Sequence, residues 1–156
     1  MRPNRQIVPL RNFNPDEFLC KCGRCNKSTD PELMVRLQAF IYIVEREFKA
    51  PVRCWIDGPA RCIPHNINVY KRLGVTEYRE SYHVGMSRGR GGIEDQCGAA
   101  VDVRIEIHTG KDWVRIAKER IAELAIESKL FGGVGWKIYG PASVFTHLDL
   151  GPVREF

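Results

Sequence analysis

The stretch AVDVRIEI, residues 100–107, alternates apolar and polar side chains for eight residues. Such alternation predicts a β-strand that buries one face and leaves the other accessible. The buried face would carry the four apolar side chains Val101, Val103, Ile105 and Ile107. On the other face Asp102 stands next to the small Ala100, so we expect its carboxylate to reach a shallow cleft.

Helical and strand patterns on both sides of this stretch predict an α+β domain. Upstream, Asp30 and Pro31 form a helix start, and apolar residues then recur at helical spacing as far as Phe48. Downstream, residues 109–112 resemble a second helix start, with Trp113 first on its buried face. We therefore expect a small antiparallel sheet of about four strands with two main helices. The expected strands are 52–56, 100–107, 134–138 and 144–150, the last two joined as a hairpin through 139–142, and a short helix can form at 67–73.

The bulk properties are those of a single domain, residues 1–156. Hydrophobic residues make up 44% of the chain, enough for a core, and no apolar run reaches the length of a membrane span. Residues 1–5 carry charge but no apolar segment follows, so we expect no secretory signal. The net charge of +5 and the pI of about 9.0 either keep the protein soluble or favour polyanions such as nucleic acid, anionic lipid or an acidic bacterial wall.

An N-terminal arm, residues 1–28, contains a tight C-x-C-x-x-C pattern made by Cys20, Cys22 and Cys25. This spacing is typical of a metal-binding knuckle, and without an export signal disulfides are not the default. A fourth ligand would come from elsewhere, and Cys62 and His65 are candidates. The alternative is three reduced thiols in a loop, or a partial disulfide.

Two histidines lie far from each other in the chain, His83 in the stretch SYH and His147 in the stretch FTHLD, residues 145–149. With Asp102 they offer two imidazoles and one carboxylate. Three N or O ligands, with a fourth position left to water, suit a catalytic zinc. Spacing alone would instead favour two ordinary histidines, because only a fold can bring them together.

The order of these motifs is similar to that of a known enzyme family. Residues 81–83 and 98–102, S-Y-H and G-A-A-V-D, resemble the S-x-H-x-x-G-x-A-x-D signature of zinc D-Ala-D-Ala carboxypeptidases and related peptidoglycan endopeptidases. These enzymes belong to a superfamily that also holds lysostaphin-type enzymes and the hedgehog signalling domain. Further stretches agree with the resemblance, the first of them with the opening arm of phage-type members: 13–25, 58–66, 131–135 and 145–154.

The resemblance implies a hedgehog-like or D-Ala-D-Ala-peptidase-like fold and a zinc-dependent hydrolase that cleaves peptide stems of peptidoglycan, as a D,D- or L,D-peptidase. It implies His83, Asp102 and His147 as zinc ligands. It also implies Arg61 as the group that steadies the substrate or the developing oxyanion, and Ser81 as a polar neighbour of the ligands. A second, structural zinc can be held by Cys20, Cys22, Cys25 and Cys62.

The segment 84–97 departs from the signature. Eighteen residues separate His83 from Asp102, many more than the signature has. The inserted segment is rich in glycine and arginine, which predicts a loop or a lid. Its Arg88 and Arg90 could also contact nucleic acid, although a single short run is weak support for that function.

The general base is the second departure. Related enzymes often carry an acidic residue or a histidine shortly before the last ligand, where this chain has Val144 and Phe145. Asp149 shares a face with His147 and could act as the base, or it could only orient a ligand. Glu94 and Asp95 in the inserted loop are further candidates for the general base.

The expected setting follows from these motifs. The protein would be made in the bacterial cytoplasm and would act on the wall after lysis or as part of a virion, as a phage endolysin or a wall-remodelling enzyme. Its expected partners are peptidoglycan and neighbouring virion subunits, with no membrane span, and nucleic acid is the least favoured partner. If no residue serves as the base, the alternative is a non-catalytic structural or wall-binding module of a virus particle on the same scaffold.

Overall fold

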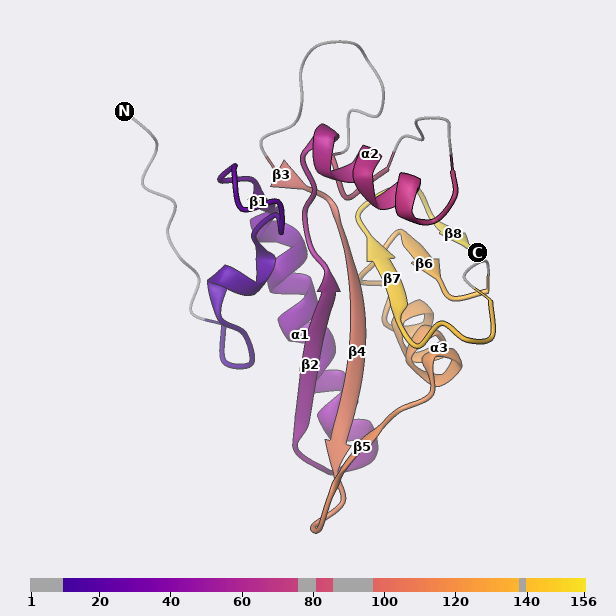
Figure 1. Ribbon diagram of the computed structural model, residues 1–156. Helices are drawn as coiled ribbons and strands as arrows, with labels where there is room; N and C mark the ends of the chain where they lie inside the picture. The colour runs from indigo at the N-terminus through magenta and orange to yellow at the C-terminus, as the bar shows by residue number, and fades with distance from the viewer. Residues whose placement is uncertain (1–9, 76–80, 86–96, 138–139) are drawn as a thin grey trace.

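The strand β4, Ala100–His108, lies at the centre of the fold (Figure 1). It pairs antiparallel with β2, Val52–Gly58, on one side and with β7, Thr146–Asp149, on the other. Both pairings fix which residues of β4 face each neighbour, and the predicted strand at 100–107 is confirmed. The computed structural model describes residues 10–75, 81–85, 97–137 and 140–156.

Four shorter strands and an edge strand complete two sheets. In the main sheet β6, Gly133–Gly135, pairs antiparallel with β7, and β8, Arg154–Glu155, runs parallel to β6. The edge strand β5, Trp113–Arg115, pairs antiparallel with β4. The main sheet is therefore mixed and six-stranded, in the order β2-β4-β7-β6-β8 with β5 beside β4. A separate parallel pair joins β1, Ser28–Thr29, to β3, Cys97–Gly98.

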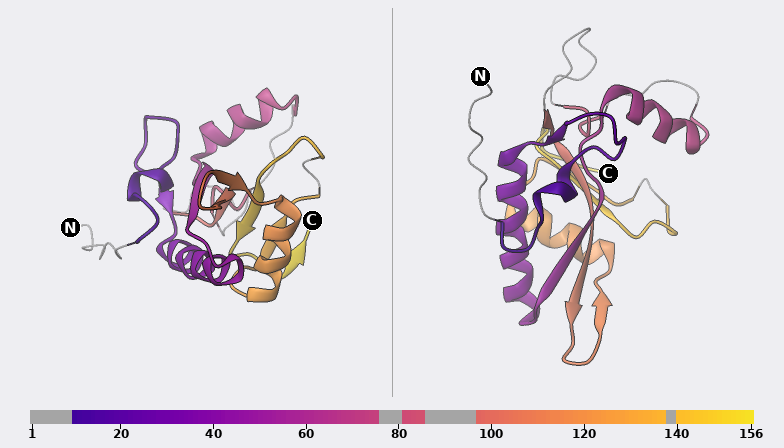
Figure 2. Two further views of the ribbon diagram at one scale, coloured as in Figure 1. Left: turned by 90° about the horizontal axis from the view of Figure 1, so that it is seen from below. Right: turned by 60° about the vertical axis from the view of Figure 1, so that its left-hand side comes forward.

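The helices lie on both faces of the main sheet (Figure 2). On one face lie α1, Pro31–Phe48, and α3, Lys118–Ser128, while α2, Ile63–Arg72, crosses the other face near one end of the strands. A short 3-10 helix, η1, spans Pro15–Phe18. Within the described ranges, no helix is long and apolar enough to cross a membrane.

The apolar face of β4 forms the core together with α1. The helix begins where the Asp30 side chain accepts a hydrogen bond from the amide of Glu32 at 2.8 Å. Phe40 meets Phe131 edge to face, with ring centroids 5.5 Å apart. Because this face is filled, the polar face of β4 remains for a site. The fully buried side chains of the core include Leu33, Leu37, Phe40, Ile41, Val44, Val101 and Leu148.

The α+β class is confirmed, but the expected sheet of about four antiparallel strands with two main helices is wrong. Strands β5 and β8 have three and two residues, too few to show a period in the sequence. The helix expected at 67–73 is α2, which already begins at Ile63. Pro64 lies in its first turn, where the amide hydrogen that proline lacks would have no partner within the helix, so this proline is compatible with a helix that begins at Ile63.

The helix start expected at 109–112 is also wrong. Thr109 and Asp112 instead close the turn between β4 and β5, with the Thr109 amide donating to the Asp112 carbonyl at 2.9 Å and Gly110 at φ +93°. Trp113 follows in β5 and is 37% exposed rather than buried, and α3 begins only at Lys118. Threonine and aspartate accept hydrogen bonds equally well in turns and at helix starts, so the sequence could not separate the two.

Some predictions lie outside the described residues. These are the charged start of the chain and nearly all of the inserted segment: residues 1–5, 86–96 and, within the latter, Arg88, Arg90, Glu94 and Asp95.

Candidate metal centre

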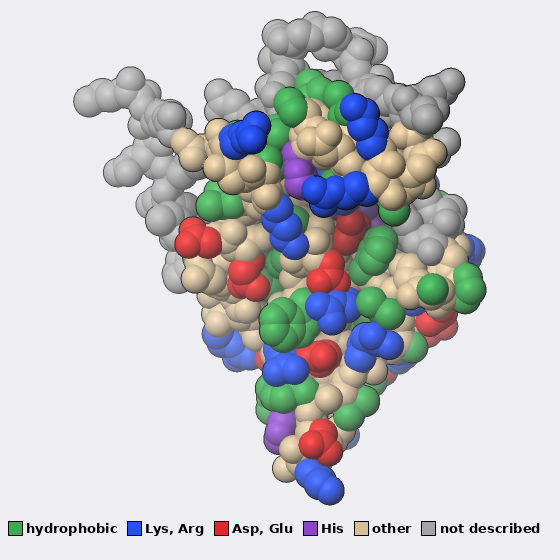
Figure 3. Space-filling view, viewed as in Figure 1, with side chains coloured by type: hydrophobic (Ala, Val, Ile, Leu, Met, Phe, Trp, Pro, Cys, Tyr) green, Lys and Arg blue, Asp and Glu red, His purple; other side chains and the backbone are tan. Residues whose placement is uncertain are grey.

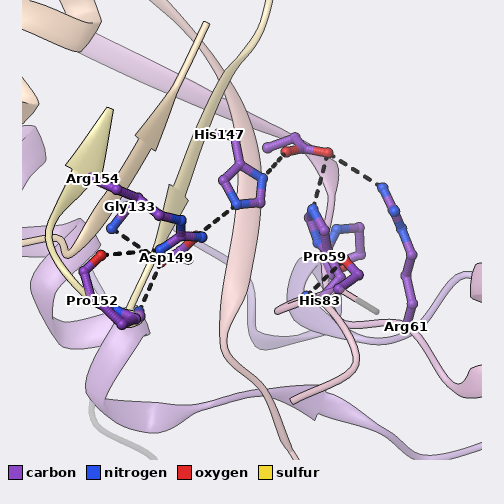
Figure 4. A network of polar contacts seen from close by, with 11 residues as sticks. Pro59, Arg61, His83, Gly133, His147, Asp149, Pro152 and Arg154 are labelled. Atoms are coloured by element: carbon purple, nitrogen blue, oxygen red, sulfur yellow. Dashed lines mark hydrogen bonds and ion pairs between the residues drawn. The ribbon is translucent and has the colours of Figure 1, made fainter. Parts of the chain in front are cut away.

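The structure brings together the three residues predicted as metal ligands. Asp102 on β4 and His147 on β7 are direct register partners. His83 lies outside the sheet, in the segment 81–85, where its carbonyl accepts a hydrogen bond from the amide of Arg61 at 2.8 Å. One ligand atom from each of the three lies within 4.8 Å of the other two (Figure 4).

His83 presents Nε2 to this centre. Its Nδ1 lies 2.9 Å from the carbonyl oxygen of Pro59, and because a carbonyl only accepts, Nδ1 carries the proton. Burial lowers the pKa of His83 more than the charge of Asp102 raises it, so the ring is neutral and Nε2 bears a lone pair. That lone pair lies 3.3 Å from Oδ2 of Asp102. Two acceptors in this position are stabilised by a cation between them.

His147 has a carboxylate at each ring nitrogen. Its Nδ1 lies 2.9 Å from Oδ1 of Asp102, and its Nε2 lies 3.0 Å from Oδ2 of Asp149. Burial opposes the charged ring, but the hydrogen bonds to Asp102 and Asp149 raise the pKa of His147 to about 9. A metal at Nδ1 would displace one proton and leave Nε2–H donating to Asp149.

Asp102 is the carboxylate that both histidines share. Burial opposes its ionisation, yet the hydrogen bond from the charged His147 ring holds the pKa of Asp102 below its usual value. Arg61 adds a positive charge, with Nη2 3.3 Å from Oδ2 of Asp102 and Nη1 3.4 Å from the side-chain oxygen of Asn66. The carboxylate is therefore ionised and ready to bind a cation.

This donor set fits a zinc ion. Two imidazole nitrogens and one carboxylate oxygen are ligands of the borderline softness that zinc prefers, and a catalytic zinc has three protein ligands. Each ligating histidine would donate its remaining N–H to an oxygen, from Pro59 in one case and Asp149 in the other. Such outer partners fix the ring orientation of metal-bound histidines.

Asp149 lies on the far side of His147 from the centre (Figure 4). It is fully buried and is held by the amides of Gly133 and Gly151, at 3.0 and 2.8 Å. The two terminal guanidinium nitrogens of Arg154, Nη1 and Nη2, also donate to it, at 3.1 and 2.6 Å. With these partners and His147, the position suits a group that orients the ring, the second of the two roles that the sequence left open.

A cavity of about 370 Å³ opens beside the centre. Besides the three ligands, it is lined by Arg61, Tyr70, Ser81 and Phe145. Ser81 is next to a ligand as expected, since its hydroxyl accepts from the amide of His83 at 3.3 Å.

A larger groove, of about 900 Å³, adjoins this cavity and shares Arg61 with it. Its lining includes the positive side chains of Lys21, Arg24 and Arg72. Figure 3 shows Lys and Arg side chains gathered on this part of the surface, over α2 and the adjacent strand ends. The two cavities together form a basic cleft that leads to the candidate metal ligands.

Sequence reasoning missed three neighbours of the centre. Pro59 supplies a carbonyl to His83, and Arg154 holds Asp149. Gly58 stands opposite Asp102, and a Cβ there would lie 2.4 Å from Oδ2 of that carboxylate. The Gly-Pro pair at the end of a strand predicted only a turn, and no spacing rule indicates that its backbone contacts a ligand.

The metal-free protein should show a pH dependence of stability that originates at His147. The pKa of this ring rises from 6.5 to about 9 on folding, so its stabilising charge is present in full below about pH 6.5 and is lost toward about pH 9. We expect the free energy of unfolding of the wild type to exceed that of His147→Gln most below pH 6.5. Denaturant titrations in chelator at several pH values measure this difference, and a difference that does not shrink by about pH 9 would contradict the assignment.

The resemblance to a known enzyme family rests on the sequence motifs alone. Comparison of the chain with family models, with curated proteins and with solved structures finds no match in any of the three. The hedgehog-like or D-Ala-D-Ala-peptidase-like fold therefore stays a prediction from the resemblance.

Proposed function

We propose that the protein is a zinc-dependent peptidase that cleaves the peptide stems of bacterial peptidoglycan. The observation that carries this proposal is the convergence of His83, Asp102 and His147, each aimed at one point. The second nitrogen of each ring is already engaged by Pro59 or Asp149. Ordinary buried histidines also have hydrogen-bonded ring nitrogens; what favours a metal here is that Nε2 of His83 is left facing the carboxylate of Asp102 beside His147.

The groups around the centre would have different roles in hydrolysis. A bound zinc would supply Lewis acidity, polarising the scissile carbonyl and lowering the pKa of a water to about 7. Arg61 lies at the junction of the cavity and the basic groove, where its guanidinium can bind a substrate carboxylate or stabilise negative charge on the carbonyl oxygen. Asp149 keeps the His147 ring in one tautomer and one orientation.

The basic cleft supports the choice of substrate. Peptidoglycan stems carry free carboxylates, and Lys21, Arg24 and Arg72 line the groove that ends at Arg61. The charge of +5 of the whole chain acts in the same direction. The setting stays as proposed from the motifs: synthesis in a bacterial cytoplasm, and action on the wall after lysis or from a virion.

A non-catalytic, wall-binding module of a virus particle is the second candidate function. The specific observation in its favour is that, among the described residues, no carboxylate other than Asp102 lines the cavity. Asp149 is fully buried behind His147. A general base would then have to come from a part of the chain outside the described ranges, such as Glu94 or Asp95.

Metal analysis combined with wall digestion tests the proposal. Purified protein should contain zinc, and incubation with purified peptidoglycan should release new amino termini or alanine, in a reaction that chelator stops and zinc restores. Mass spectrometry of the products identifies the cleaved bond. Zinc bound without any released product would instead establish the non-catalytic module.

Asp149→Asn should separate the orienting role of this carboxylate from that of a general base. If Asp149 orients His147, the zinc affinity of the variant falls about 10- to 100-fold, and hydrolysis returns when zinc is added to saturation. Zinc titration followed by wall digestion of the same samples measures both quantities. Loss of hydrolysis that persists at saturating zinc would make Asp149 the base.

A matched control for this variant is Glu106→Gln. Glu106 also accepts hydrogen bonds, from Arg53 and from the indole of Trp55, but it lines neither cavity. It should leave zinc affinity and hydrolysis unchanged, so that any effect of Asp149→Asn is assigned to the centre.

A further inference from the structure

Four thiols from two distant segments meet beside the groove of about 900 Å³, whose lining includes Cys22, Cys25 and Cys62. Cys20, Cys22 and Cys25 follow η1, and Cys62 immediately precedes α2. One Sγ from each lies within 4.8 Å of the other three. Cys62 thus completes the knuckle, whereas His65, the other candidate, is not part of this group.

The distances suit a shared ion better than a pair of disulfides. The Sγ atoms of Cys20 and Cys62 lie 3.8 Å apart, and those of Cys22 and Cys25 lie 3.4 Å apart. A zinc ion bound to four thiolates at about 2.3 Å in a tetrahedron places the sulfurs about 3.8 Å from one another. A disulfide would require about 2.05 Å, and these four cysteines are reduced.

The backbone around the thiols is arranged to receive negative sulfur. The amide of Arg24 points to Sγ of Cys22 at 3.3 Å, and the amide of Cys62 points to Sγ of Cys20 at 3.4 Å. Gly23 adopts a left-handed conformation, with φ +71°, which lets the chain turn between Cys22 and Cys25.

The charges nearby also favour a thiolate cluster. Four thiolates around a divalent ion carry a net charge of about −2. Lys21 and Arg24 alternate with the cysteines in the chain and line the same groove as Cys22, Cys25 and Cys62. Lys21 is held in place by the carbonyl of Asp57, at 2.8 Å from its Nζ.

We propose that Cys20, Cys22, Cys25 and Cys62 form a second metal site, a tetrathiolate of the structural zinc class, which fastens the N-terminal arm to the loop that carries Arg61. Without the ion, single hydrogen bonds such as that from Lys21 to the carbonyl of Asp57, just before this loop, would connect the two segments. Because Cys62 follows Arg61 directly and caps α2, the ion fixes both the guanidinium and one wall of the groove. This inference is independent of the His–Asp–His centre.

Cobalt(II) replacement is the decisive experiment, because only thiolate ligands give intense sulfur-to-cobalt charge-transfer absorption in the near ultraviolet. Wild-type protein, freed of zinc under reducing conditions and loaded with cobalt, should show this band. Cys25→Ser and Cys62→Ser should lose it, whereas Cys97→Ser, a thiol outside the cluster, and His83→Ala should keep it. Wild-type protein that binds cobalt without the band, or a Cys62→Ser variant that retains it in full, would overturn the site.

Zinc counting and hydrogen exchange provide readouts that do not depend on peptidase activity. The wild type should hold two zinc ions per chain, and Cys25→Ser should hold one. Amide protection should fall in residues 19–29 and 61–66 of this variant and stay unchanged in α3. If both segments keep their protection when the thiolate-bound ion is lost, the fastening role is wrong. If the His–Asp–His centre fails instead, one zinc and the thiolate band still remain.

Discussion

His83→Ala should remove the ion from the His–Asp–His centre and abolish hydrolysis of peptidoglycan. The variant deletes one of three ligands, so its loss of zinc affinity should exceed the roughly 10- to 100-fold loss expected when only an outer partner is removed. The fold should survive, because the His83 ring belongs to the segment 81–85 and not to the apolar core on the other face of the sheet.

Zinc per chain and wall digestion measure the effect of His83→Ala. The count should fall by one ion, and the cobalt–thiolate band of the cysteine site should be unchanged. His108→Ala is the matched control, because His108 ends β4 at the far end of the sheet and meets Trp113 edge to face, with ring centroids 5.2 Å apart. Hydrolysis by His83→Ala at the wild-type rate would exclude this centre as the catalytic site.

Gly58→Ala should impair the same centre without altering any ligand. A Cβ at Gly58 would lie 2.4 Å from Oδ2 and 3.0 Å from Cγ of Asp102, distances that unstrained atoms do not adopt. The Asp102 carboxylate must therefore turn away from His83 and His147. We expect zinc affinity to fall by at least 10-fold, comparable to loss of an outer partner, with hydrolysis reduced in proportion at limiting zinc.

The comparison variant for Gly58→Ala is Gly110→Ala. Gly110, in the turn between β4 and β5, has φ +93°, and a Cβ there meets nothing within 4 Å. This variant should cost about 1–2 kcal/mol of stability through backbone strain but keep its zinc. If Gly58→Ala binds zinc as tightly as Gly110→Ala does, a Cβ at position 58 does not displace the Asp102 carboxylate. The close approach of Gly58 to Asp102 would then have no functional role.

The central strand could be predicted because the burial of one of its faces appears in the sequence as alternation of apolar and polar residues. Residues 100–107 alternate with period two, and β4 buries Val101, Val103 and Ile105 as expected. The edge strands of the sheet show no such alternation in the sequence. Strand β8 has two residues, and β5 follows a turn whose threonine and aspartate also suit a helix start, so tertiary pairing decided the outcome.

The candidate site was predictable to a different extent. Asp102 and His147 lie on strands whose period indicated the correct faces. His83 lies in a segment without any period, and only the resemblance to a known signature selected it. The role of Asp149 could not be chosen from sequence, because it depends on two amides and on Arg154, contacts that exist only once β6, β7 and the C-terminal segment have assembled.

The uneven support of the three ligands has a consequence for how fast an ion leaves the centre. Asp102 and His147 are anchored on adjacent paired strands, whereas His83 lies outside the sheet, in the segment 81–85. Opening of this segment alone would remove His83 and leave the ion with two protein ligands, while the sheet stays intact. We therefore expect the residence time of the ion to depend on local opening of the segment around His83 rather than on the global stability of the domain.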